Sequence, residues 1–361
     1  VEIAGVAISF SKLTLVVEFV VMAVVLVVRP WGLLGRPQAA PRQGGAIEAP
    51  LRAPDSLAKA ATAALVLALV ALPALSAQSP YVVVLAVDIL VAVLFATSLH
   101  FIMGPAGMHS FGHAAYFGLG AYGAAIVLKA TGAPMPAVLV AAPLVAAAGA
   151  VVVGWFSVRL SGVYLAMLTL AFAQIAWAIV YQWDAFTGGS NGLTGVWPPE
   201  WLADKRAYYA LTLALVLAGV FVLRRILHAP FGYAMRAARD SVLRADAIGI
   251  DVKRVQWVAF VIAGLFAGLA GALFAFSKGS ISPESLHVGK SDSQVDDLEL
   301  VSVLVSWRDE VVIAVEFVDP LECPHHREAG LIKVVEQQER DPVGTTDFVS
   351  QFSARDYGHS L

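Results

Sequence analysis

G-P-A-G-M-H-S-F-G-H-A-A-Y-F-G-L-G-A-Y-G-A-A-I-V-L-K, residues 104–129, is the stretch that decides the fold of this chain. Its opening residues 104–107 break a helix, and from Ala114 an apolar run resumes with small residues at helical spacing. Backbone without helical hydrogen bonds is stable in hydrocarbon only where protein buries it or where it lines a wet cavity. We therefore predict a non-helical turn followed by a closely packed membrane helix.

The composition independently indicates a membrane protein. Hydrophobic residues make up 58% of the 361 and charged residues 14%, with a mean hydropathy of +0.74. Soluble domains carry about 25% charged residues. A single cysteine, Cys323, excludes an intrachain disulfide framework, and no nucleotide-binding motif occurs. We expect no cofactor, no bound metal and no nucleic-acid partner.

The apolar runs predict an all-α, polytopic transmembrane helical bundle of about seven or eight spans. Residues 13–28 contribute one span if residues 4–12 extend it. The others are expected at 60–77, 81–103, 113–130, 135–157, 163–183, 207–224 and 256–277.

The charges predict the orientation of these spans. If residues 37–59 are cytoplasmic, alternation places Arg42 and Arg239 on the cytoplasmic side and Asn191 on the periplasmic side. Every strong basic cluster except Lys205-Arg206 then lies inside, as the positive-inside rule expects.

The segment S-F-G-H-A-A-Y-F-G-L-G-A-Y, Ser110 to Tyr122, resembles the signature of permease subunits of ABC importers for branched-chain amino acids, and a looser resemblance extends over about residues 57–291. The resemblance implies a bacterial inner-membrane subunit without catalytic chemistry, which forms half of a gated path. It also implies a companion permease, two cytoplasmic ATPase subunits, a periplasmic solute-binding protein and surrounding membrane lipid. The signature or pathway residues that it implies are Ser110, Gly112, His113, Tyr116, Gly118, Gly120 and Tyr122.

Two loops extend the resemblance. T-G-G-S-N-G-L-T-G-V, residues 187–196, resembles a family loop that would face the solute-binding protein, through Gly188, Gly189, Asn191 and Gly192. The cytoplasmic segment 229–254 resembles the family's ATPase-coupling loop, and its alternative is a basic loop held on anionic lipid. Read as one helix, it presents small residues on a docking surface and ends at Gly249. Its candidate residues are Arg236, Arg239, Asp240, Ala245, Asp246 and Gly249.

The ends of the chain predict its domains. R-P-W-G-L-L-G-R, residues 29–36, is similar to the last part of the companion permease, so residues 1–36 are expected to be that tail, or else an additional anchor. Residues 37–59 read as a cytoplasmic linker and 60–291 as an incomplete permease domain.

The last segment departs from the family. Residues 1–289 carry 18 Lys and Arg against 12 Asp and Glu, whereas residues 290–361 carry 6 against 15. Residues 292–361 contain no run near the about 20 residues that a span needs. We expect a poorly structured tail outside the bilayer, from a displaced reading frame or truncated gene, or else a genuine soluble appendage. A displaced frame would leave the permease without its last helices and unable to assemble normally.

Two other functions compete with the permease. A stand-alone secondary transporter would bury ion-coupling carboxylates, and Asp88 is the one acid well inside a clear span after residue 60. An intramembrane metalloenzyme could use His109 and His113, which would share a face on a helix, although no nearby acid completes a zinc site. His113 and Ser110 are expected either to line the pathway or to hydrogen-bond between helices.

Overall fold

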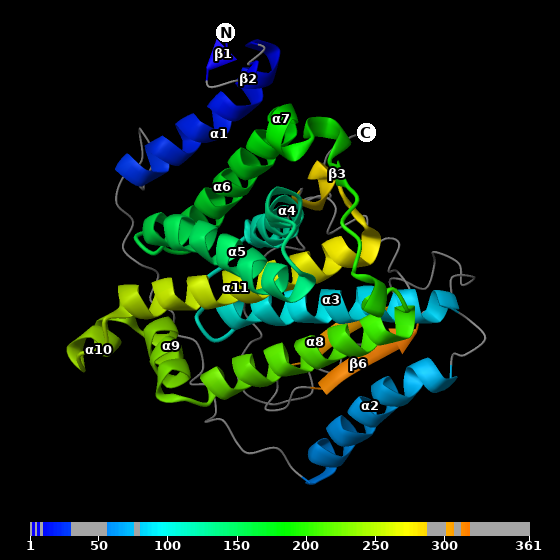
Figure 1. The fold of residues 1–361 in the computed structure, drawn as a ribbon. Coiled ribbons are helices and arrows are strands. Elements are labelled where there is room, and N and C mark those ends of the chain that lie inside the picture. The colour runs from blue at the N-terminus through cyan, green and yellow to red at the C-terminus, as the bar shows by residue number, and fades with distance from the viewer. Residues whose placement is uncertain are drawn as a thin grey trace, which may run out of the picture. The chain divides into compact units, whose positions relative to one another are not determined.

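Helices dominate the computed structural model, which describes residues 2–3, 6–7, 10–29, 56–75, 80–286, 301–306 and 312–317 (Figure 1). The helices are α1 Phe10–Val28, α2 Ser56–Leu75, α3 Pro80–Met103, α4 His113–Thr131, α5 Met135–Ser157, α6 Val163–Gln182, α7 Asp184–Thr187, α8 Lys205–Leu227, α9 Pro230–Asp240, α10 Val242–Ala247 and α11 Val252–Lys278. Short 3-10 turns occupy Gly189–Asn191, Glu200–Leu202 and Pro283–Leu286.

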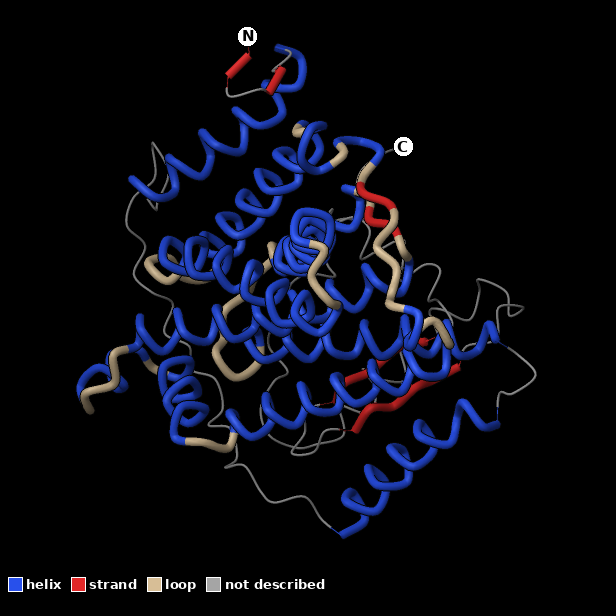
Figure 2. Tube along the Cα trace, in the orientation of Figure 1, coloured by secondary structure: helices blue, strands red, loops and turns tan. Residues whose placement is uncertain are grey.

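The strands are short and form three two-stranded pairs within the described residues (Figure 2). They are β1 Glu2–Ile3 with β2 Val6–Ala7, β3 Leu193–Thr194 with β4 Ser280–Ile281, and β5 Val301–Ser306 with β6 Val312–Phe317. The described part of the chain is therefore a helical protein, as predicted.

Each of the seven predicted ranges after residue 60 is helical, with ends that differ by four residues or fewer. Among the described residues, five helices are long and apolar enough to cross a membrane: α3, α5, α6, α8 and α11. The described parts of α1 and α2 are shorter apolar helices. Helix α4 has 19 residues and is less apolar, since it includes His113, two tyrosines, three glycines and Lys129.

The core is built around α4 and α11. Helix α11 packs against α3, α4 and α5, and α4 also packs against α5 and α6. In Figure 1, α4 is viewed nearly along its axis while α11 and α3 run across the picture. One buried cluster includes Leu94, Tyr122 and Phe276, and a second includes Phe101, Tyr116 and Phe260.

The loop after α6 and the end of α11, which the predicted orientation places on the periplasmic side, contact each other. Strands β3 and β4 pair antiparallel, with Leu193 opposite Ile281 and Thr194 opposite Ser280. The backbone N–H groups of Gly195 and Val196 donate to the carbonyl oxygen of Gly279 at 3.0 and 3.1 Å. These bonds join the loop after α6 to the end of α11, as the predicted alternation requires.

Several predictions lie outside the described residues. They concern most of the linker 37–59 and the R-P-W-G-L-L-G-R segment beyond Arg29. Within residues 292–361, the structure describes only β5 and β6.

The orientation can be tested by cysteine labelling in a Cys323→Ser background. Asn191 and Leu243 are both exposed, and Leu243 is 84% exposed. We expect an impermeant maleimide to label Asn191→Cys in intact cells and Leu243→Cys only after lysis. Labelling of Leu243→Cys from the periplasm would reverse the orientation.

Candidate functional site

The connection between α3 and α4 is a turn, as predicted from the sequence. Helix α3 ends at Met103, and the Gly104 N–H donates to the His100 carbonyl oxygen at 2.8 Å. Gly107 has φ 65°, a left-handed backbone that favours glycine, and the Met108 N–H then donates to Ile102 at 3.2 Å. The chain is thereby turned back, and α4 begins at His113.

The turn is anchored on α6 just before α4 begins. The Phe111 N–H donates to Thr169 Oγ1 at 3.2 Å, and Thr169 donates to the Ala166 carbonyl oxygen at 2.9 Å. A methyl group on Gly112 would collide with the Thr169 carbonyl oxygen. The signature glycine therefore permits the close approach of two backbones.

His113 is buried between helices. Its Nε2 lies 2.8 Å from Ser98 Oγ, and Ser98 donates to the Phe95 carbonyl oxygen at 2.7 Å. A hydroxyl has one proton, so His113 Nε2 donates to Ser98 and Nδ1 is left as an acceptor. Within the described residues, His113 Nδ1 has no hydrogen-bond partner, and the same is true of the buried Ser110 Oγ.

The two tyrosines of the signature are also buried in α4. Tyr116 meets the rings of His113 and Phe260 edge to face, at centroid distances of 5.8 and 6.3 Å. The hydroxyl of Tyr122 is buried and has no hydrogen-bond partner in the described part of the chain. Ser110, His113 and Tyr122 thus place three polar groups with unused hydrogen-bonding capacity along the turn and α4.

The structure separates the two histidines of the metalloenzyme hypothesis. His109 is exposed in the connection, whereas His113 is buried in α4, so they do not share a helical face. Over the described ranges, no group of three His, Cys, Asp or Glu residues is arranged to hold a metal ion.

Rows of small residues bring α4, α5 and α11 together. A methyl group on Gly120 would collide with the backbone of Gly268, and one on Gly268 would collide with Ala146. Gly118 instead faces the side chain of Leu286. Helix association in hydrocarbon depends on such close packing, because lipid tails are as apolar as the helix surfaces.

The cytoplasmic segment 229–254 differs from its sequence-based interpretation. The predicted single helix is divided into α9 and α10 at Ser241, whose backbone is extended and whose Oγ accepts a hydrogen bond from the Arg244 N–H at 3.3 Å. The prediction that Gly249 ends the helix is confirmed, since it follows α10 with φ 88°.

The small residues of this segment face inward. Ala238 and Ala245 are 2% and 1% exposed and pack with Val252 in a small core. The exposed large apolar side chains on α10 and just after it are Val242, Leu243 and Ile248, and they lie among the exposed charged residues Arg244 and Asp246. The sequence interpretation missed these apolar residues, although apolar side chains in a polar cytoplasmic segment are a recognisable signal of a contact surface.

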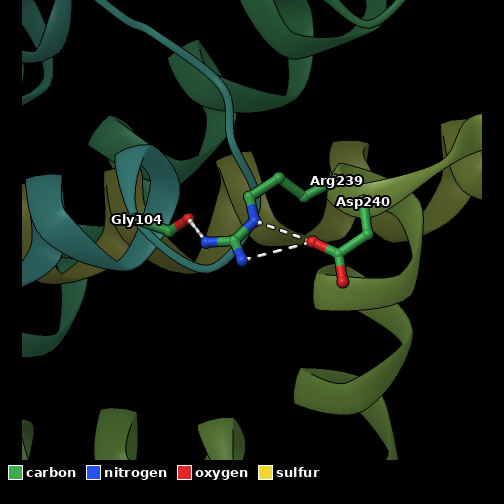
Figure 3. A network of polar contacts seen from close by, with 3 residues as sticks. All are labelled: Gly104, Arg239 and Asp240. Atoms are coloured by element: carbon green, nitrogen blue, oxygen red, sulfur yellow. Dashed lines mark hydrogen bonds and ion pairs between the residues drawn. The ribbon is translucent and has the colours of Figure 1, made fainter. Parts of the chain in front are cut away.

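Arg239 joins this segment to the turn after α3 (Figure 3). Its Nη1 donates to the Gly104 carbonyl oxygen at 3.0 Å, while Nε and Nη2 lie 3.3 and 3.2 Å from Asp240 Oδ1. Its aliphatic stem packs against Gly107, where a methyl group would collide with it. Of the other predicted residues, Arg236 is half-buried and Asp246 is exposed.

The loop 187–196 is folded onto the end of α11. Gly188, Gly189 and Gly192 have positive φ angles of 75°, 54° and 71°, and a methyl group on Gly192 would collide with Ile281. Thr187 Oγ1 lies within hydrogen-bonding distance of the carbonyl oxygens of Val180 and Trp183. Asn191 is exposed at the tip of this loop.

Comparison with known proteins identifies similar sequences. Residues 81–291 match the family described as "Branched-chain amino acid transport system / permease component". The chain is 29% identical over 229 residues to the high-affinity branched-chain amino acid transport system permease protein LivM of Escherichia coli (strain K12), covering 56% of this chain and 54% of that protein. LivM of Salmonella typhimurium (strain LT2) is 28% identical over 229 residues, which again cover 56% of this chain and 54% of that protein.

A third similarity covers a shorter segment of the chain. The guanosine ABC transporter permease protein NupQ of Bacillus subtilis (strain 168) is 36% identical over 70 residues, or 19% of this chain and 21% of that protein. The chain spans about half the length of the LivM proteins that it matches. No solved structure matches.

The helix contact at Gly120 yields a matched test. Gly120→Ala should lower the thermal unfolding temperature of the purified protein, because the methyl group meets backbone that cannot move aside; overpacking of this kind costs about 1–3 kcal/mol. Gly123→Ala should lower the unfolding temperature less, since its methyl group would lie 3.2 Å from a Val145 side-chain atom, a tight contact that a small shift of that side chain relieves. Equal unfolding temperatures for the two variants would contradict the proposed contact.

Proposed function

Because the chain belongs to the family of branched-chain amino acid transport permease components, we propose that it forms half of the membrane path of an ABC importer for branched-chain or related amino acids. A companion permease supplies the other half, two cytoplasmic ATPase subunits supply energy, and a periplasmic solute-binding protein delivers the solute. The LivM similarity supports this substrate class. The guanosine permease similarity makes a direct substrate test necessary.

We further propose seven or eight spans in the inner membrane, with α1, α2 and α4 joining the five long apolar helices. Residues 1–36 correspond to the end of a companion permease, 37–59 to a cytoplasmic linker, 60–291 to the permease domain and 292–361 to an atypical tail. The signature residues lie along this path, and the loop containing Asn191 faces the solute-binding protein.

The observation that carries the proposal is the hydrogen bond from Arg239 to Gly104. The last carbonyl groups of a helix lack intrahelical partners and carry partial negative charge, so a guanidinium group stabilises them. A movement of α9 therefore acts directly on the end of α3. The same turn is bonded to α6 through Phe111 and Thr169, and it leads to His113 at the start of α4.

These contacts provide a physical route for coupling. ATPase subunits that dock on α10 bias the position of α9, and Arg239 transmits that bias to the turn where the polar signature residues are buried. Alternating access requires that the protein adopt two arrangements. The state of the ATPase subunits and the bound solute must each favour one arrangement over the other. A hydrogen-bonded turn between packed helices is an element that can adopt two such arrangements.

The secondary-transporter alternative is weakened by the partner of Asp88. Its Oδ2 lies 2.7 Å from Lys278 Nζ, so the carboxylate of α3 forms an ion pair with the end of α11. A carboxylate that is neutralised within the protein is poorly suited to bind a coupling cation.

The transport function and its coupling can be tested together in proteoliposomes that contain the assembled importer. We expect ATP-dependent uptake of labelled leucine, competed by isoleucine and valine but not by guanosine.

Arg239→Gln should reduce uptake about tenfold with ATP hydrolysis retained, because it removes a charge-assisted hydrogen bond. Arg225→Gln, at an exposed arginine on α8, is the control and should retain uptake. Equal uptake by both variants would refute the role of Arg239, and competition by guanosine alone would refute the substrate class.

The docking surface makes a separate prediction. Leu243→Glu should weaken the association with the ATPase subunits in pull-down measurements without lowering the unfolding temperature, because Leu243 is 84% exposed. Ala245→Glu should lower the unfolding temperature, since it buries an unpaired charge beside Ala238. Normal ATPase association in Leu243→Glu would exclude this surface.

A further inference from the structure

Helices α2 and α8 border a groove of about 540 Å³ that the transport function does not use. Two basic residues lie at one end of it, Lys59 on α2 and Arg224 on α8. The remaining wall is mainly apolar and comes from α2, through Ala63, Val66, Leu67 and Val70.

Contacts elsewhere on α2 explain why this groove stays open. Tyr209 Oη on α8 donates to the Leu69 carbonyl oxygen at 2.8 Å, and Leu69 and Leu72 pack against the buried cluster of the bundle. The groove-lining face of α2 is turned away from that attachment. Leu67 and Val70 are 73% and 60% exposed there.

The groove has the dimensions of one leaflet. Lys59 and Val70 are eleven residues apart on a continuous helix, which corresponds to about 16 Å at 1.5 Å per residue. Half of a bilayer's hydrocarbon core is about 15 Å thick. The predicted orientation puts the basic end at the cytoplasmic surface, so the apolar wall extends toward the bilayer centre.

The charges at the basic end select the headgroup. No carboxylate lines the groove, and no ion pair joins Lys59 or Arg224 to an acidic side chain within the described ranges. An anionic phosphate is stabilised by both groups, whereas the ammonium of a zwitterionic headgroup would be repelled by them.

We propose that this groove binds one anionic phospholipid of the cytoplasmic leaflet. Lys59 and Arg224 hold its phosphate, and one acyl chain lies along Ala63, Leu67 and Val70. The lipid thereby fills the space between α2 and the bundle and fixes the lower half of α2, which Tyr209 does not reach. This binding site is independent of the transport proposal and requires that the helices be embedded in the membrane with the predicted orientation.

Native mass spectrometry of the purified full chain tests the site, with phosphatidylglycerol and phosphatidylcholine of identical acyl chains as probes. We expect one retained phosphatidylglycerol, bound about tenfold more tightly than phosphatidylcholine. The double variant Lys59→Gln/Arg224→Gln should lose this preference. Arg225→Gln should retain it, because Arg225 is exposed on the same helix and does not line the groove.

A second pair of variants separates the groove from the charged surface. Ala63→Trp should exclude the lipid by filling the groove, whereas Ala64→Trp, at the next exposed alanine, should not. Equal losses in Ala63→Trp and Ala64→Trp, or in the double variant and Arg225→Gln, would overturn the proposal. So would full competition by glycerol phosphate, or cross-linking of Leu67→Cys to a partner helix that excludes lipid.

Discussion

The close approach of the backbones of α4, α5 and α11 is the constraint on which the rest of the structure depends. Where Gly120 meets Gly268, no side chain separates α4 from α11, and only the methyl group of Ala146 lies between Gly268 and α5. Between membrane helices the hydrophobic effect contributes little, so close packing at such contacts must hold the bundle together. Because α4 is surrounded in this way, His113, Tyr116 and Tyr122 lie inside protein and not against lipid.

Buried polar groups depend on this packing for their partners. Ser98 on α3 holds the His113 ring at the start of α4, and the Tyr208 hydroxyl donates to the Leu273 carbonyl oxygen at 2.6 Å between α8 and α11. Each bond satisfies a group that would be costly to expose to hydrocarbon. Among the described residues, five buried side-chain polar atoms lack a hydrogen-bond partner: three belong to Ser110, His113 and Tyr122 in the signature stretch, and the other two are Asp88 Oδ1 and Ser157 Oγ. The presence of three of the five in the signature stretch is consistent with a functional role for the stretch beyond packing.

The cytoplasmic segment 229–254 shows which structural features local sequence rules predict and which they do not. Its basic residues, its helical character and the terminating role of Gly249 follow from short-range rules and agree with the structure. The break at Ser241 and the inward packing of Ala245 do not follow from them, because an alanine is compatible with either a buried or an exposed position. The surface available to a partner consequently includes Leu243 and Ile248, and Ala238 and Ala245 form the support behind it.

The sequence by itself determined where the helices run, where the chain turns after α3, and which family signature the turn contains. Those properties are local, since the length of an apolar run and a Gly-Pro pair act on neighbouring residues. Only the tertiary structure decided that Arg239 bonds to Gly104, 135 residues away, and that Asp88 pairs with Lys278, 190 residues away. The physical reason is that lipid and protein interior are both apolar, so a membrane helix carries little polarity signal for the face that it buries. Shape complementarity at glycine and alanine contacts selects that face, and complementary shapes are defined only once the helices are together.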